Sequence, residues 1–170
     1  MINLWYNKIM KINIEVNNKT QSPIEDSFFV KIAQKTIEGS GLDFLFSPAG
    51  GKEISVSVAL VSEAEMQKLN KKYRQKDNVT DVLSFFEYET IEELKKAVED
   101  SLCQPEGGGI FLGELILCYN DIKKYTEIEG INFEFELAKV FAHGILHLLG
   151  FLHGKEMFSL QEKIAGSFGG

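Results

Sequence analysis

All three histidines of this 170-residue chain lie in one eleven-residue stretch, His143-Gly-Ile-Leu-His147-Leu-Leu-Gly150-Phe-Leu-His153. On a helix, His143 and His147 lie one turn apart on the same face, so both imidazoles can point at one spot. Gly150 can end that helix in the left-handed conformation and reverse the chain. We expect the reversal to bring His153 to the third corner of a tetrahedral metal site. Three protein ligands and an open fourth position are typical of catalytic zinc.

The same spacing occurs in zinc peptidases with the motif HExxHxxGxxH. Those enzymes carry a glutamate directly after the first histidine as the general base, whereas this chain has Gly144. The spacing therefore predicts a shared metal geometry without peptidase chemistry, with room beside the metal where Gly144 lacks a side chain. Three neutral imidazoles leave the charge of a divalent ion uncompensated, which favours an anionic ligand such as phosphate. The alternative is that the histidines are hydrogen-bonded residues of the core.

Composition and charge narrow the class of protein. The chain is 44% hydrophobic and 25% charged, as in one globular domain, and no run approaches the roughly 20 apolar residues of a membrane span. We therefore expect a cytoplasmic protein without membrane contact, with Cys103 and Cys118 reduced. A net charge of −7 argues against nonspecific nucleic-acid binding. Residues 68–76, however, hold five basic residues and no acidic one, and form either a solvated helix face or a basic edge beside the metal.

Hydrophobic periodicity predicts an α+β fold. The expected strands are residues 11–16, 53–61, 81–86 and 111–118. The expected helices run from a Ser22-Pro23 start to about residue 39, from a capping box at Ser62 and Glu65 to Arg74, and over residues 90–101, 120–128, 134–149 and 156–165. Because these elements do not alternate strictly, we expect a small mixed four-stranded sheet packed with five or six helices. Residues 10–170 form the predicted single domain, and residues 1–9 an extension.

Four blocks of the chain resemble the YbeY family, in the family's order. Residues 69–85 are similar to its first signature block, and Leu112-Gly113-Glu114 to its glycine–acid strand block. Residues 143–153 are similar to its HGxLHLxGYDH motif, and residues 156–164 to its C-terminal block. The resemblance implies a metal-dependent endoribonuclease of bacteria that is specific for single strands. Such an enzyme acts in rRNA maturation, at the 3′ end of the small-subunit RNA, and in ribosome quality control.

The resemblance also implies site residues and partners. His143, His147 and His153 would bind one zinc ion per chain, and Arg74 would be catalytic. The partners would be single-stranded RNA and the small ribosomal subunit. Three positions depart from the family pattern: Leu152 and Glu114 each replace an aspartate, and Phe86 replaces a proline.

Several alternatives remain open at the level of the sequence. Arg74 could instead form a surface salt bridge. Asp77 and Asp81 could lie near the cleft as acid, base or supporting groups. The chain could also be a ribosome-associated assembly factor with a mainly structural zinc, or a zinc hydrolase of another substrate class.

Overall fold

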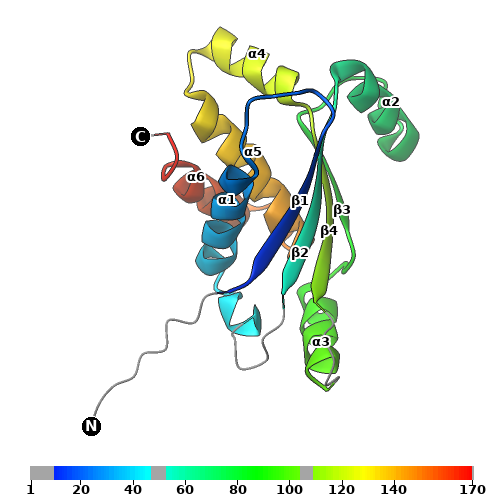
Figure 1. Cartoon of the computed structure of the whole chain (residues 1–170), viewed down its shortest axis with the longest axis vertical. Helices are drawn as coiled ribbons and strands as arrows, with labels where there is room; N and C mark the ends of the chain where they lie inside the picture. Colours follow the sequence, from blue (N-terminus) through cyan, green and yellow to red (C-terminus); the bar gives the residue numbers. More distant parts are fainter. Residues whose placement is uncertain (1–9, 47–52, 104–108, 170) are drawn as a thin grey trace.

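The computed structural model of the chain describes residues 10–46, 53–103 and 109–169, so the predicted extension at residues 1–9 lies outside the described residues. Four strands form one sheet in the order β1-β2-β4-β3 (Figure 1). Their bounds are β1 Ile12–Asn18, β2 Ile54–Leu60, β3 Val82–Phe86 and β4 Ile110–Leu117. β1, β2 and β4 run parallel, and β3 pairs antiparallel with β4 at the edge. The predicted mixed four-stranded sheet is therefore confirmed.

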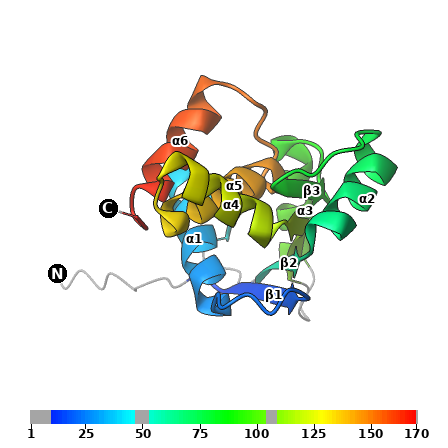
Figure 2. The same ribbon diagram turned by 90° about the horizontal axis from the view of Figure 1, so that it is seen from above.

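Helices lie on both faces of the sheet, most of them on one face (Figure 2). The helices are α1 Asp26–Gly39, α2 Glu63–Arg74, α3 Ile91–Leu102, α4 Tyr119–Glu129, α5 Phe133–Leu148 and α6 Lys155–Ala165, with a short 3₁₀ helix η1 at Asp43–Phe46. α5 packs on β3 and β4 and is flanked by α1 and α6. α2 covers part of the opposite face. In the described part of the chain, no helix has both the length and the apolar character needed to cross a membrane.

The alternation of side chains along β4 divides the core in two. Leu115 and Leu117 belong to the large core under α5, which also takes in most buried residues of α1. Ile116 and the following Cys118 belong to a smaller core, where they pack with Met66 of α2. Every second residue of this strand thus faces α5, and this alternation positions the helix that carries the first two histidines.

One predicted helix start and one predicted capping interaction differ from the structure. The first helix begins at Asp26 and not at Ser22-Pro23, because the Asn18 side chain accepts hydrogen bonds from the Thr20 and Ser22 backbone N–H groups and holds this segment in a turn. At α2, Ser62 caps the helix by accepting from the Glu65 N–H, as predicted. The Glu65 carboxylate does not complete a capping box, since it pairs with Lys19 at 2.9 Å.

Candidate metal centre

Close packing of α5 on the sheet sets the direction of His143 and His147. Gly144, between them in sequence, is buried against β4: an added Cβ would lie 2.8 and 2.9 Å from the two methyl carbons of Leu115. The expectation that Gly144 leaves room beside the metal is therefore wrong, because this position faces the sheet. The small residue lets helix and strand approach, and the two histidines, half-buried, face the other way toward a cleft.

The end of α5 brings the third histidine back, as the glycine predicted. Gly150 has a φ of +89°, in the left-handed region. Its N–H donates to the carbonyl of His147 at 2.9 Å, and the N–H of Phe151 donates to the carbonyl of Leu146 at 3.0 Å. These two bonds form the helix-ending motif in which a left-handed residue reverses the chain. The segment that follows returns along α5 and carries His153.

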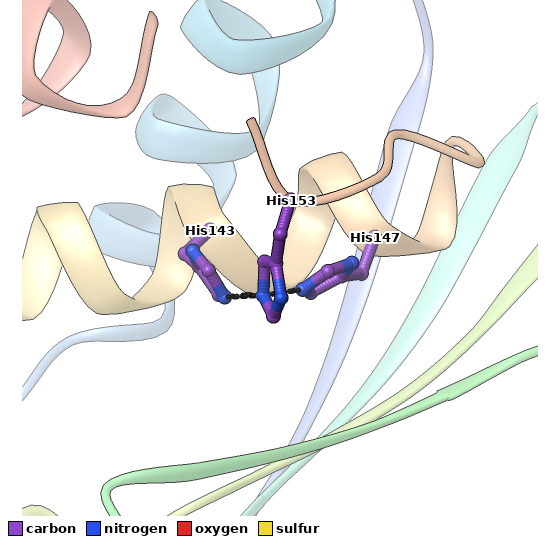
Figure 3. A group of neighbouring side chains, drawn as sticks. All are labelled: His143, His147 and His153. Carbon is purple, nitrogen blue, oxygen red and sulfur yellow. Dashed lines mark hydrogen bonds between the residues drawn. The ribbon is translucent and has the colours of Figure 1, made fainter. Parts of the chain in front are cut away.

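The three imidazole rings converge on one point (Figure 3). The Nε2 atom of His147 lies 3.1 Å from that of His143 and 2.9 Å from that of His153, and the remaining pair lies 3.3 Å apart. Ligand nitrogens of a tetrahedral zinc with bonds of about 2.0–2.1 Å lie roughly 3.3–3.4 Å apart. The spacing is thus close to that of a zinc site. His153 is exposed, so the histidines do not form a buried core cluster.

In His143 and His147 the other ring nitrogen has a hydrogen-bond partner that leaves Nε2 available to a metal. The Nδ1–H of His143 donates to Oε1 of Gln161 at 2.7 Å, and the Nδ1–H of His147 donates to the carbonyl of Phe151 at 3.1 Å. Each bond leaves the Nε2 lone pair free to face the common point. Burial, and next the neighbouring His143, lowers the pKa of His147 to about 4. The imidazole is therefore neutral at pH 7, the form that binds a metal.

The histidines lie on the wall of a cavity of about 600 Å³ between α5 and the α2–β3 region. Arg74 and Lys76 line it as well, and none of the described residues that line it carries a carboxylate. The Arg74 guanidinium donates to the Ser84 carbonyl at 2.9 Å and lies 5.8 Å from the ring centre of Phe85. The described ion pairs do not include Arg74, so the salt-bridge alternative gains no support.

A comparison with protein-family models matches residues 13–169 to the family described as Endoribonuclease YbeY. The chain belongs to the YbeY family. Of the relatives named Endoribonuclease YbeY, the one from Oceanobacillus iheyensis is 34% identical over 164 residues, which is 93% of this chain and 98% of that protein. The relative from Dehalococcoides mccartyi strain CBDB1 is 33% identical over 144 residues, covering 85% and 81%. The solution structure of TM1509 from Thermotoga maritima matches with a TM-score of 0.54 and 25% identity, covering 90% and 87%.

The two aspartates of the first YbeY signature block have different surroundings. Asp77 is exposed and pairs with Lys71 at 2.6 Å, and this hydrogen bond lowers the pKa of the carboxyl group below its ordinary value. Asp77 does not line the histidine cavity. Asp81 lines a neighbouring cavity together with His143. Of the two, only Asp81 therefore shares a cavity wall with one of the three histidines.

Other residues in the blocks that resemble the YbeY family differ in whether they line the cleft. The basic run of residues 68–76 is divided: Lys71 is paired with Asp77, whereas Arg74 and Lys76 line the cleft. Leu152, where the resemblance implies an aspartate, is 83% exposed and lines the cleft. Gln161 was not predicted as a site residue, because its role depends on a contact with His143, which lies 18 residues earlier in the chain. Its only signal was its place in the C-terminal block.

Proposed function

We propose that this YbeY-family chain is a zinc-dependent endoribonuclease that cuts single-stranded RNA, with His143, His147 and His153 as the metal ligands and Arg74 as a catalytic residue. The main support is the convergence of three Nε2 atoms within 2.9–3.3 Å of one another, in a cleft that also carries a guanidinium group. Family membership supplies the class of reaction.

The donor set suits zinc. Three imidazoles are the ligands of a well-known class of catalytic zinc site with an open position, and two of those present here, His143 and His147, are oriented through their Nδ1–H groups. A zinc ion held there would polarise a phosphoryl oxygen or lower the pKa of bound water from about 15.7 toward about 7. Manganese and magnesium prefer oxygen ligands, which the described cleft offers only as hydroxyl, amide and carbonyl groups.

Arg74 is suited to bind the phosphate in the transition state. Its guanidinium has five N–H donors in a rigid fork, and the Ser84 carbonyl accepts from Nη2, which orients the group. A planar fork can bind two phosphate oxygens at once, which lysine cannot do. The described lining of the cleft also lacks a carboxylate that would repel a phosphate. The chain's own contribution is therefore to position the phosphodiester and stabilise its developing charge.

The biological setting follows from the family. We propose that the substrate is ribosomal RNA, that the cut contributes to maturation of the 3′ end of the small-subunit RNA, and that the small ribosomal subunit is the partner. This assignment would place the protein in the cytoplasm. Gly144 faces Leu115, so the peptidase-like alternative lacks the general base at this position.

The test combines elemental analysis with cleavage of a labelled single-stranded RNA. Arg74→Ala should keep one zinc per chain and lose about 10²- to 10³-fold in kcat, the range found when one donor to a developing anion is removed. His147→Ala should lose both zinc and cleavage. Lys31→Ala, which removes an exposed cation on α1, is the control and should match the wild type. Wild-type protein that holds zinc but cuts no RNA would refute the proposal.

Two further measurements separate the remaining alternatives. A chelator that abolishes cleavage with the fold largely retained supports a catalytic metal, whereas global unfolding of a protein that never cleaves supports a structural one. A substrate with a 2′-deoxy nucleotide at the cut site identifies the nucleophile. Loss of cleavage of this substrate would mean that the RNA's own 2′-hydroxyl attacks, and retained cleavage would mean that water does.

A further inference from the structure

Phe158 of α6 is an exposed aromatic residue beside the three histidines. The residue is 46% exposed, and its ring is nearly parallel to two imidazoles: the angle to His143 is 14° at 6.4 Å between ring centres, and the angle to His153 is 18° at 5.8 Å. Proteins that bind single-stranded RNA often stack unpaired bases on such rings. Phe158 therefore offers a flat apolar surface next to the position where the reacting phosphate would bind.

Phe158 also lines a separate cavity of about 220 Å³. We call this cavity the side pocket; its walls include Phe158, Asp81, Glu136, Gln161 and His143. His143 and Val82 line both the side pocket and the cleft with Arg74, so the two spaces adjoin. A nucleotide whose phosphate lies in the cleft can therefore place its base in the side pocket.

The side pocket differs in charge from the cleft: its walls carry the carboxylates of Asp81 and Glu136 and one cation, Lys139, whereas the cleft carries Arg74 and Lys76. Glu136 is 6% exposed and pairs with Lys139 at 3.0 Å, so its charge is compensated. Asp81 uses Oδ1 to accept from the Val82 N–H at 2.8 Å and from the Thr80 hydroxyl at 3.2 Å. Among the described residues, no hydrogen bond engages its Oδ2 atom. The Asp81 carboxylate thus disfavours a phosphate beside it, and its Oδ2 atom can accept from an uncharged ring with N–H groups.

We propose that the side pocket binds the nucleobase next to the scissile phosphate, stacked on Phe158 and hydrogen-bonded to Asp81, with a preference for guanine. Guanine presents its ring N1–H and its exocyclic amino group side by side, so both can approach the Oδ2 atom of Asp81. In uracil the ring N–H lies between two carbonyl oxygens that repel a carboxylate. This inference rests on the proposed endoribonuclease function and adds a base preference to it.

The stacking surface is tested by Phe158→Leu, with Phe111→Leu as the matched control. Phe111 is 42% exposed on β4 and does not line either cavity. Phe158→Leu should lower kcat/KM for single-stranded RNA by about 5- to 150-fold, the range for loss of one base–aromatic stack, with zinc content unchanged. The control should retain wild-type kcat/KM. An unchanged kcat/KM in Phe158→Leu would overturn the stacking role, and so would a loss that is explained by missing zinc.

The base preference is tested by Asp81→Asn, with exposed Asp100→Asn as the control. Four RNAs differ only in the base beside the cut, and the dissociation constants of guanosine and uridine monophosphate are measured by NMR. Wild type should prefer guanine over uracil in both assays by about tenfold, the lower part of the range for one specific contact to a base edge. Asp81→Asn should bring the ratio near one, and the control should keep it.

The outcomes separate this inference from the proposed function. RNA cleavage without base preference, or a preference that survives Asp81→Asn, overturns the guanine-binding role of the side pocket alone. Absence of RNA cleavage, with guanosine monophosphate still bound more tightly than uridine monophosphate and dependent on Asp81, overturns the endoribonuclease proposal and supports the pocket.

Discussion

Replacing Gly150 with alanine tests how the reversal after α5 holds the metal centre. Gly150 and Gly130 both follow a helix and both have positive φ, +89° and +67°. Their surroundings differ. A Cβ at Gly150 would lie 2.7 Å from the backbone nitrogen of Ile91 and 3.0 Å from the carbonyl carbon of Thr90, whereas a Cβ at Gly130 would meet nothing within 4 Å. Gly130→Ala is therefore a matched control for backbone strain without a clash.

The expected losses of unfolding free energy follow from backbone strain and from the steric clash. A left-handed conformation costs an alanine about 1–2 kcal/mol, which applies to both variants. Overpacking adds about 1–3 kcal/mol only at Gly150, where the clash is with the backbone at the start of α3, which cannot rotate away as a side chain can. The change from glycine also restricts the unfolded chain, but equally in both variants, so it cancels in the comparison. We expect Gly150→Ala to lose about 2–5 kcal/mol of unfolding free energy and Gly130→Ala about 1–2 kcal/mol.

The measurement is urea unfolding followed by circular dichroism, with a chelator present so that metal binding does not contribute to stability. Zinc affinity is then measured in competition with a chromogenic chelator. Only Gly150→Ala should also bind zinc more weakly, because the displaced segment carries His153 and the Phe151 carbonyl that orients His147. Equal losses of unfolding free energy in the two variants, or unchanged zinc affinity in Gly150→Ala, would refute the account of this turn.

Two further predictions concern groups around the imidazoles. Gln161→Met keeps the size of the side chain but removes the acceptor for the His143 Nδ1–H. Zinc affinity, measured in chelator competition, should therefore fall about 10- to 100-fold. Unchanged affinity would contradict the orienting role of Gln161. Leu152→Asp places a carboxylate at an 83% exposed position in the cleft, so its unfolding free energy should stay within about 0.5 kcal/mol of the wild-type value. Because the new charge attracts a cation and repels phosphate, the variant should bind zinc more tightly and single-stranded RNA, measured by fluorescence anisotropy, more weakly. Tighter RNA binding would contradict the charge argument.

The sequence predicted the elements of the fold better than their junctions. Alternation and capping placed the strands and most helices within a residue or two, because burial of one face imposes a period that is visible locally. The start of α1 was missed, since the Asn18 side chain holds the preceding turn and competes with helix formation. The position of β3 at the sheet edge, antiparallel to β4, depends on pairing that no local pattern contains.

The convergence of the histidines was already determined by the sequence, because helix periodicity and a glycine reversal act over only ten residues. Only the tertiary structure decided which groups surround the point on which the histidines converge. Packing turned Gly144 toward Leu115, brought Gln161 of α6 to His143, and placed Phe158 and Asp81 on the walls of the same side pocket. These contacts join separate elements, and their geometry depends on how the layers pack. Spacing along one chain does not encode that packing.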